Sequence, residues 1–317
     1  MSEKKHDVLV VGELNIDLIL NKIDKFPDIG KEVIAREIKQ TLGSSSAIFA
    51  NNLSVLEAKV SFLGKVGNDS YADQINTSLK SSGVDLTYLL KSQTHLTGIT
   101  VAFNFGNDRA MVTYPGAMND LTIEDITDEA LQSASHLHVS SVFLQESLKP
   151  GLTELFQRAR KLNLTTSLDT QWDPSEKWDL NLKSLLPWVD IFMPNEIEIT
   201  RLTKTSTVED ALKKISADCR IVVVKRGVKG ALLYDNGRII EQQAYLNEHV
   251  IDAIGAGDSF NAGFISKFIK RKSLEECLDF GALTGAVNTT AAGGTGAFKS
   301  FEAVKKCIKE NFNKNIS

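Results

Sequence analysis

The sequence predicts an α/β fold in which a central, mostly parallel sheet carries helices on both faces and a small second β-sheet stands beside it. Between residues 136 and 224, short apolar runs alternate with segments whose apolar residues recur at helical spacing, which is typical of successive βαβ units. Residues 7–11 form a continuous apolar run, as in a strand buried on both faces. Residues 97–105 and 109–114 instead alternate in polarity around a turn at 106–108, which indicates a hairpin.

The length and composition suit one large α/β domain, alone or with a small accessory domain, and we assign residues 1–317 to a single domain. The chain has 317 residues, 42% of them hydrophobic, and a net charge of −4. An acidic chain is a poor binder of a phosphate backbone, so nucleic acid is not expected as a partner. The apolar run near the start is too short for a signal peptide or a membrane span, and the three cysteines lie far apart without metal-ligand spacing. We therefore expect a reduced, cytoplasmic setting without membrane contact.

The first part of the chain predicts elements of both sheets. The predicted strands cover 7–11, 13–18, 31–42 and 60–63, the hairpin covers 97–114, and the predicted helices cover 47–56 and 70–81. Because the strands after residue 13 and the hairpin alternate in polarity, we expect them to form the small sheet, built from about 13–42 and 96–116.

The second part predicts the rest of the parallel sheet and its helices. The predicted strands cover 136–140, 165–169, 189–193 and 220–224, and the predicted helices cover 149–162, 197–203, 208–215, 261–270 and 273–292. Such a series of crossovers places helices on both faces of the sheet.

Residues 252–260 join a turn of small residues directly to a helix. Gly255, Ala256 and Gly257 leave the backbone accessible, and the N–H groups at a helix start favour an anion such as phosphate. Asp258 would then lie beside the anion that it should repel. Phosphoryl transfer explains both features, because the carboxylate takes a hydroxyl proton while the amides stabilise the moving phosphoryl group. The alternative is an ordinary capped helix after a tight turn.

Polar residues also follow other predicted strands, where open α/β sheets bind their ligands. Glu13, Asn15 and Asp17 share one face of a strand, and they either line a pocket or form an exposed edge. Gly43 and Ser44 open a loop before a helix, which suits close approach of a ligand or a plain serine N-cap. The strands ending at 140 and 169 are followed by the polar residues Gln145, Glu146, Asp169, Gln171 and Asp173.

Three further segments have two readings each. Asn195 and Glu198 follow the strand ending at Met193, which suits a Mg²⁺ held largely by water or an acid-rich helix start. Residues 225–230 form a basic, glycine-bracketed turn, which suits nucleotide phosphates or a solvated hairpin. Small residues along the helix at 273–292 permit close approach of another helix or of an adenine ring.

The segment DAIGAGDSFNAGF at 252–264 resembles the C-terminal signature of the ribokinase, or pfkB, family of carbohydrate kinases. The segment at 64–85 is also close to the family pattern, and Asn195 with Glu198 matches its NxxE motif. The resemblance implies a ribokinase-like fold, in which the small sheet is a lid over the sugar site and often pairs two protomers in a homodimer. It also implies ATP-dependent transfer of a phosphoryl group to a hydroxymethyl group of a small carbohydrate, such as ribose, fructose or a ketodeoxy sugar.

The resemblance gives roles to individual residues. Asp258 is implied as the catalytic base, with Gly255, Ala256 and Gly257 as the anion hole and Glu198 organising Mg²⁺ through water. The expected nucleotide contacts are Asn195, Lys225, Gly227, Gly230, Ala282 and Asn288. The expected substrate contacts are Asn15, Asp17, Gly43, Ser44 and Gln145. A K⁺ site of some members corresponds to Asp252 and the carbonyl of Ile254.

The loop that contacts the sugar departs from the family pattern. Ser44 replaces the second glycine of the family's Gly-Gly signature, and Ile48 takes the position of an asparagine that contacts the sugar. The identity of the sugar is therefore not predicted. The chain has no compact cluster of Arg and Lys that would mark a second phosphate site, which favours an unphosphorylated substrate.

Two other functions stay open on the sequence. A nucleoside kinase of the same fold needs an aromatic side chain in the lid to stack on the base, and Phe103 or Phe105 could serve. A non-catalytic, sugar-binding regulatory relative is expected to lack the base or the anion turn, and both are present here. A Rossmann dehydrogenase and a P-loop NTPase are not expected, because the sequence has no GxGxxG and no GxxxxGK[ST] motif.

Overall fold

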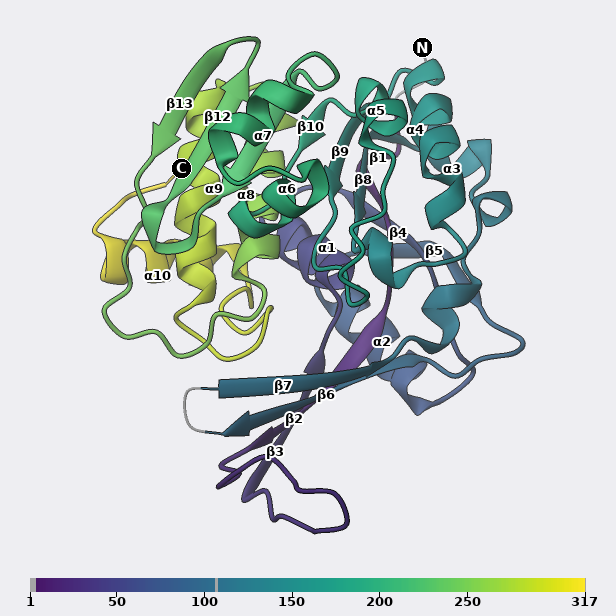
Figure 1. Cartoon of the computed structure of the whole chain (residues 1–317), viewed down its shortest axis with the longest axis vertical. Helices are drawn as coiled ribbons and strands as arrows, with labels where there is room; N and C mark the ends of the chain where they lie inside the picture. The colour runs from purple at the N-terminus through teal and green to yellow at the C-terminus, as the bar shows by residue number, and fades with distance from the viewer. Residues whose placement is uncertain (1–3, 106–107, 317) are drawn as a thin grey trace.

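The computed structural model describes residues 4–105 and 108–316, and it confirms the α/β class with a separate small sheet (Figure 1). The large sheet contains β1 (His6–Val11), β4 (Val60–Val66), β5 (Asp85–Lys91), β8 (Ala134–Ser140), β9 (Thr165–Asp169), β10 (Ile191–Phe192), β11 (Ile221–Lys225), β12 (Ala231–Asp235) and β13 (Arg238–Gln242). The small sheet contains β2 (Asn15–Asn21), β3 (Glu37–Leu42), β6 (Gly98–Phe105) and β7 (Asp108–Tyr114).

The large sheet has the order β13-β12-β11-β10-β9-β8-β1-β4-β5 within the described residues. In this order, the seven strands β11, β10, β9, β8, β1, β4 and β5 pair in parallel with their neighbours. Strands β12 and β13 add an antiparallel edge. Since parallel strands end at the same edge of the sheet, the polar segments that follow β1, β9, β10 and β11 come together there.

Helices cover both faces of the large sheet. They are α1 (Ser45–Val55), α2 (Ser70–Ser81), α3 (Asp128–Gln132), α4 (Leu152–Lys161), α5 (Leu182–Leu185), α6 (Glu196–Thr203), α7 (Val208–Ile215), α8 (Ala256–Phe268), α9 (Leu274–Asn288) and α10 (Phe301–Phe312). Strand β1 is apolar throughout because successive residues enter different cores: Val8 and Val10 pack on the α1 and α8 side, and Leu9 and Val11 pack on the α4 side.

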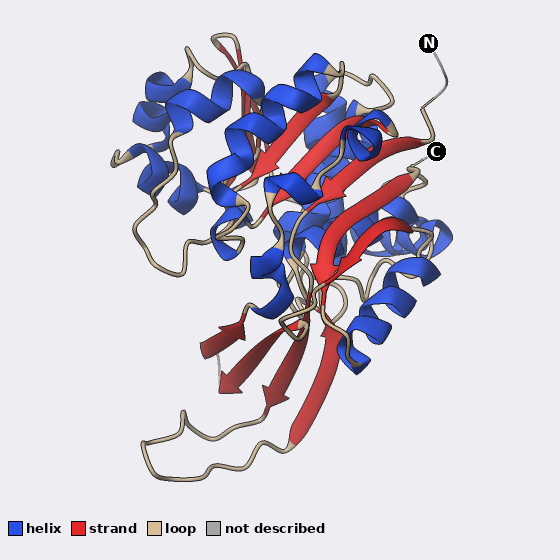
Figure 2. Ribbon diagram, turned by 90° about the vertical axis from the view of Figure 1, so that its right-hand side faces the viewer, coloured by secondary structure: helices blue, strands red, loops and turns tan. Residues whose placement is uncertain are grey.

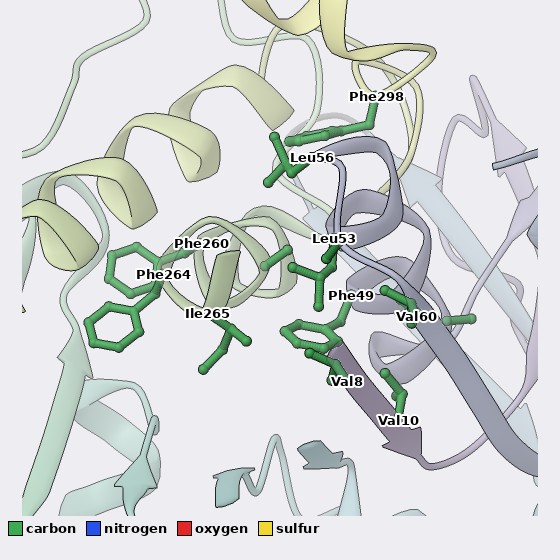
Figure 3. Close-up of a cluster of buried hydrophobic side chains, with 14 of the residues drawn as sticks. Val8, Val10, Phe49, Leu53, Leu56, Val60, Phe260, Phe264, Ile265 and Phe298 are labelled. Atoms are coloured by element: carbon green, nitrogen blue, oxygen red, sulfur yellow. The ribbon is translucent and has the colours of Figure 1, made fainter. Parts of the chain in front are cut away.

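The core between α1 and α8 fixes the two helices whose first turns reach the strand ends. Figure 3 shows Phe49 and Leu53 of α1 facing Ile265 of α8, with Val8 and Val10 beneath them. Phe49 and Phe264 are at most 1% exposed. Burial of each such aromatic side chain contributes about 2–3 kcal/mol, so the starts of α1 and α8 are held firmly relative to β1.

The small sheet, of order β3-β2-β6-β7, projects from one end of the body (Figures 1 and 2). β2 pairs in parallel with β6, with Asp17 opposite Thr100, while β3 and β7 pair antiparallel to their neighbours. The predicted strand over 31–42 starts only at Glu37, and the predicted turn at Gly106 and Asn107 lies outside the described residues. None of the described helices is both long and apolar enough to cross a membrane.

Candidate active site

A cavity of about 480 Å³ lies where the small sheet meets the body, beside the start of α8. Its wall comes from the small sheet, from the start of α1, from the segments that follow β9, β10 and β11, and from the turn before α8. The predicted site residues that line it are Asp17, Ser44, Asn195, Glu198, Lys225, Ile254, Gly255, Gly257 and Asp258.

Gly255 holds the turn before α8 in a conformation that favours glycine. Its φ of +76° is in the left-handed region, and a Cβ atom at this position would lie 2.6 Å from Cα of Gly294 and 3.2 Å from Cγ2 of Ile48. A larger residue would therefore strain the backbone and push the neighbouring loop away.

Two amides in the first turn of α8 are open to a ligand. The Ala256 amide donates to the Ala253 carbonyl at 3.2 Å, which corrects the expectation that all the turn amides face an anion. Among the described residues, no backbone carbonyl accepts a hydrogen bond from the amide of Gly257 or Asp258. Together with the helix dipole of α8, these N–H groups suit the binding of an anion.

Asp258 directs its carboxylate toward the same place. The residue is 6% exposed and lines the cavity. Its Oδ1 accepts a hydrogen bond from Gln171 Nε2 at 2.9 Å, and the Ser45 hydroxyl also bonds to it, so the carboxylate does not serve as the ordinary helix cap of the alternative reading. Burial raises the pKa of Asp258 well above its usual range, the Asp169 carboxylate adds to the shift, and Lys225 opposes it. A carboxylate in this setting suits a general base.

Asp169 and Lys225 form a buried ion pair at the ends of β9 and β11. Lys225 Nζ lies 2.5 Å from Oδ2 of Asp169, whose side chain is fully buried. The same oxygen accepts hydrogen bonds from Gln171 Nε2 at 3.0 Å and from Asn261. Burial alone would lower the pKa of Lys225, but the carboxylates of Asp169 and Glu198 raise it above its usual value, so the ammonium stays charged.

Glu198 and Asn195 form a reciprocal capping box at the start of α6. The Glu198 carboxylate accepts from Asn195 N at 2.9 Å and from Asn195 Nδ2 at 2.6 Å, while Asn195 Oδ1 accepts from the Glu198 amide. Burial raises the pKa of Glu198 to about 7, and the Asp169 carboxylate adds to the shift. The predicted helix start is therefore present, and the same carboxylate also lines the cavity.

A magnesium ion fits this carboxylate through water. In the part of the chain that the structure describes, no group of three His, Cys, Asp or Glu side chains could hold a metal directly. Mg²⁺ usually keeps several waters and takes one or two carboxylates from the protein. The Glu198 carboxylate has lone pairs beyond its two hydrogen bonds, and a nearby dication would favour its charged form.

The cavity side of β2 carries the polar groups predicted for substrate. Asn15 Nδ2 donates to Asp17 Oδ1 at 2.9 Å and to Thr100 Oγ1 at 2.8 Å. Asn15 is 5% exposed and Glu13 is 1% exposed, so the exposed-edge alternative is wrong for both. Gly43 packs against this cluster, since a Cβ atom there would lie 2.2 Å from Asp17 Oδ1. The cluster can exchange hydrogen bonds with several hydroxyls of a small molecule.

Ser44 both caps α1 and borders the cavity, as the two readings of this loop predict. Its hydroxyl accepts from the Ala47 amide at 2.9 Å and donates to the Glu13 carbonyl at 2.6 Å. One turn into the helix, Ile48 adds an apolar side chain to the cavity wall.

Gln145 and Asn288, like Asn15 and Gly43, are predicted contact residues that do not line the cavity. Gln145 is fully buried, and its Nε2 donates to the Ser140 carbonyl at 2.8 Å. Asn288 is also fully buried, and it accepts from the Ser259 hydroxyl at 2.9 Å and donates to the Ile254 carbonyl at 2.6 Å. Asn288 therefore braces the turn before α8 from inside the protein.

The lid aromatics lie on the outer face of the small sheet, away from the cavity. Strand alternation puts Thr100 and Ala102 on the cavity side of β6 and puts Phe103 and Phe105 on the opposite side. Phe26 packs against both rings, with centroid separations of 5.8 and 6.1 Å. Among the described residues, no aromatic side chain lines the cavity beside Asp258.

A second cavity, of about 380 Å³, adjoins the first. Its wall includes Gly227, Gly230 and Ala282, three of the residues expected to contact the nucleotide. The rest of its wall is largely apolar and includes Val228, Tyr245, Leu246, Val250 and Phe260. Such a wall suits a flat ring, and the two cavities share Lys225, Ala253 and Gly257.

The loop that corresponds to a monovalent-cation site is held by internal hydrogen bonds. Asp252 accepts from the amides of Ile254 and Gly293, both at 2.9 Å. Lys39 of β3 donates from Nζ to the Ala292 carbonyl at 2.7 Å. A cationic side chain of the lid thus already contacts this loop.

Known proteins share this architecture across almost the whole chain. A family model for the pfkB family carbohydrate kinases matches residues 5–300. The chain is 24% identical to the ATP-dependent 6-phosphofructokinase of Thermoanaerobacterium thermosaccharolyticum, covering 96% of this chain and 94% of that protein. It is 26% identical to the ATP-dependent ribose-1-phosphate kinase of Halopiger xanaduensis, covering 96% of this chain and 99% of that protein. It also matches the structure of Arabidopsis thaliana ribokinase complexed with ribose and ATP at a TM-score of 0.82, with 25% identity and coverage of 96% and 99%. The chain therefore belongs to the pfkB family and is a carbohydrate kinase with a ribokinase-like fold.

Proposed function

We propose that this kinase transfers the γ-phosphoryl group of ATP to a hydroxymethyl group of a small, unphosphorylated carbohydrate. We name the 480 Å³ cavity the acceptor cavity and the 380 Å³ cavity the nucleotide cavity. The position of Asp258 carries the proposal, because this carboxylate lines the acceptor cavity beside the two open amides of α8. An acceptor and a nucleotide in the two cavities would meet at their shared wall.

In the proposed reaction, Asp258 takes the proton of the acceptor hydroxyl, and the oxygen attacks the γ-phosphorus. The bond from the γ-phosphorus to the β–γ bridging oxygen breaks, and ADP leaves with its electron pair. The amides of Gly257 and Asp258 donate to the phosphoryl oxygens as charge spreads over them. The raised pKa of Asp258 makes the carboxylate a better proton acceptor than one in water.

The nucleotide cavity has room for the remaining groups of ATP. We assign the adenine ring to the apolar wall near Ala282 and the phosphates to the turn at Gly227 and Gly230. Glu198, held by Asn195, would bind Mg²⁺ through water, and that ion, when bound, would neutralise phosphate charge. The loop at 252–254 stays the proposed place of a K⁺ ion, which a comparison of activity in K⁺ and Na⁺ buffers tests.

The acceptor cavity favours a carbohydrate over a nucleoside and over a sugar phosphate. Its described lining has no aromatic ring for a base to stack on. Its charged lining residues are Asp17, Glu198, Asp258 and Lys225, and the lysine is already paired with Asp169. A second phosphate would therefore meet more negative than positive charge. The polar cluster around Asn15 and Thr100 supports recognition of sugar hydroxyls.

The outer face of the lid supports a homodimer through the lid. Among its apolar side chains, Ile38 is 70% exposed, Val112 is 61% exposed and Tyr114 is 45% exposed. Strand pairing puts Val112 opposite Val101 on the same face as Phe103. A second copy of the chain would cover this face. We treat residues 1–317 as one kinase domain, with the lid segments 13–42 and 96–116 inserted in it.

A substrate panel tests the proposed function. Purified enzyme is incubated with ATP, Mg²⁺ and individual pentoses, hexoses, deoxy and keto sugars, nucleosides and sugar phosphates, and ADP release is measured. We expect turnover with at least one unphosphorylated sugar and loss of that turnover in Asp258→Asn. Preferred turnover of a nucleoside would support the alternative kinase, and saturable sugar binding without any turnover would support the regulatory relative.

A further inference from the structure

Lys225 occupies the boundary between the two cavities. Its side chain lines both of them, and its Nζ lies 3.7 Å from the point where a Cβ atom of Gly257 would stand. The ammonium is therefore next to one of the two open amides of α8. A lysine that contacted only the base or the ribose of ATP would line the nucleotide cavity alone, whereas Lys225 lines both cavities.

The charge of Lys225 is anchored by groups that the proposed reaction does not otherwise use. Asp169 Oδ2 lies 2.5 Å from Nζ, and Asn261 Oδ1 lies 3.5 Å from it. The Lys225 side chain is 12% exposed, while that of Asp169 is fully buried. Two donors of the ammonium are thus directed inside the protein, and the third can be directed to the cavities.

Gln171 links this ion pair to Asp258. Its Nε2 donates to Asp169 Oδ2 at 3.0 Å and to Asp258 Oδ1 at 2.9 Å. The residue has a φ of +60°, in the left-handed region that a non-glycine residue seldom adopts, so the loop after β9 is held in a special conformation to present this amide. Gln171 thus holds one oxygen of the Asp258 carboxylate in place at the wall of the acceptor cavity.

We propose, on the basis of the proposed function, that Lys225 is a catalytic residue that contacts the phosphoryl group during its transfer, and that Asp169 and Gln171 are positioning residues that hold the ammonium and the base at a fixed separation. The transferred group spreads negative charge over three oxygens. The amides of α8 donate to it from one side, and Lys225, which borders both cavities, reaches it from another.

A purely structural ion pair would be an expensive way to join β9 to β11. Burying two charges costs several kcal/mol, and an apolar pair of similar volume often stabilises as well or better. A pair that also serves a developing phosphoryl charge explains why an ammonium is kept beside the anion turn. If the ion pair were only structural, replacing Lys225 would lower stability and weaken the binding of every ligand. If Lys225 is catalytic, its replacement would weaken the binding of the transition state alone.

The test compares Lys225→Met with Lys213→Met, whose wild-type side chain is 79% exposed on α7 and contacts Asp210. For Lys225→Met we expect kcat with the panel-selected sugar to fall by about 10²–10³-fold, while the KM for ATP changes less than about fivefold. Binding of ADP with aluminium fluoride, which mimics the phosphoryl group in transfer, should weaken by a similar factor to kcat, while binding of ADP alone stays within about threefold. Lys213→Met should match the wild type in all four measurements.

Further variants separate the positioning residues from a structural role. Lys225→Arg should recover part of kcat, because it restores the charge. Gln171→Leu and Asp169→Asn should lower kcat and analogue binding while ADP binding is retained. If Lys225→Met does not fold, the arginine and leucine variants decide the matter through the same kcat and analogue measurements.

Two results would overturn the inference. One is a folded Lys225→Met enzyme with wild-type kcat, and the other is equal weakening of ADP and of ADP with aluminium fluoride, which would make Lys225 a nucleotide-binding residue only. Either result leaves turnover by the wild-type enzyme intact, so it does not touch the proposed function. Absence of turnover of every sugar and nucleoside by the wild type would instead remove the proposed function itself.

Discussion

The turn before α8 and the lid face the same cavity but are built in different ways. The turn is enclosed by buried groups: Asp258 is 6% exposed, and Asn288 and Ser259 behind it are fully buried. The lid is a four-stranded sheet outside the main core, with Ile38 and Val112 more than half exposed. The residues assigned to phosphoryl transfer thus lie on helices and strand ends that the core holds rigid. Several residues assigned to acceptor binding lie instead on the small sheet, where movement or substitution affects the core less.

The largest expected effect comes from the rigid side of this comparison. Asp258→Asn should lower kcat by about 10³-fold, because the amide cannot accept the hydroxyl proton. The KM for ATP should change little, since the substitution keeps the shape of the residue. ADP release with the sugar selected from the panel measures both values. An unchanged kcat would show that another group removes the proton.

A lid residue should affect the acceptor rather than the nucleotide. Asp17→Asn weakens hydrogen bonds between a carboxylate and sugar hydroxyls, so kcat/KM for the sugar should fall by about 10–100-fold. The KM for ATP should stay within about twofold. Asp24→Asn, at an 80% exposed side chain of the same lid segment, is the matched control and should behave as the wild type. A rise in the KM for ATP alone would contradict the assignment of this cavity to the acceptor.

The pH dependence of stability tests the electrostatics of the rigid side. The pKa of Glu198 is raised to about 7 in the folded protein, above its value in an unfolded chain. At a pH between these two pKa values, unfolding therefore releases a proton. In the absence of Mg²⁺ and nucleotide, its contribution to the free energy of unfolding should therefore fall as pH rises from about 4.5 to about 7, and should change little above that. Melting temperatures of the wild type and Glu198→Gln should diverge through this window, with the variant less sensitive to pH. Parallel curves would show that Glu198 is already ionised in the fold.

The smallest effect on catalysis is expected from the outer face of the lid. Val112→Lys puts a charge on the proposed dimer face and should convert a dimer into a monomer, with kcat within a fewfold of the wild type. Light scattering coupled to gel filtration measures the mass. Ile239→Lys, at a 54% exposed apolar residue on the edge strand β13, is the control and should leave the mass unchanged. A wild-type monomer would remove the dimer proposal.

Sequence periodicity was sufficient for most of the fold. The helix at 70–81, the strand at 165–169 and the helix at 208–215 have the predicted bounds, because regular apolar spacing and clear end signals agree there. Strand β5 was not predicted, since its residues are half-exposed and mixed in polarity at the sheet edge. Helix α8 starts at Ala256 rather than Asn261, because small residues give no apolar period although they lie in the helix.

The site could be predicted where a motif is local in sequence and not where it depends on tertiary contacts. The anion turn and the box of Asn195 with Glu198 are each contained in a few residues. The contacts of Gln171 with Asp258 and of Lys225 with Asp169 join residues 87 and 56 positions apart, and nothing in the spacing specifies them. Asn288 was expected on the nucleotide, and only the packing of α9 against α8 shows that it faces the turn.

The close approach of Gly255, Gly294 and Ile48 limits how this chain can diverge during evolution. A Cβ atom at Gly294 would lie 2.3 Å from Ile48 Cδ1, and one at Gly255 would lie 2.6 Å from Gly294 Cα. Neither glycine can gain a side chain unless its neighbour shifts, so a single substitution of either glycine is expected to destabilise the fold. New acceptor preferences are accordingly reached more easily through Thr100, Ala102 and Met111 on the lid, where replacement leaves the glycine contact in place.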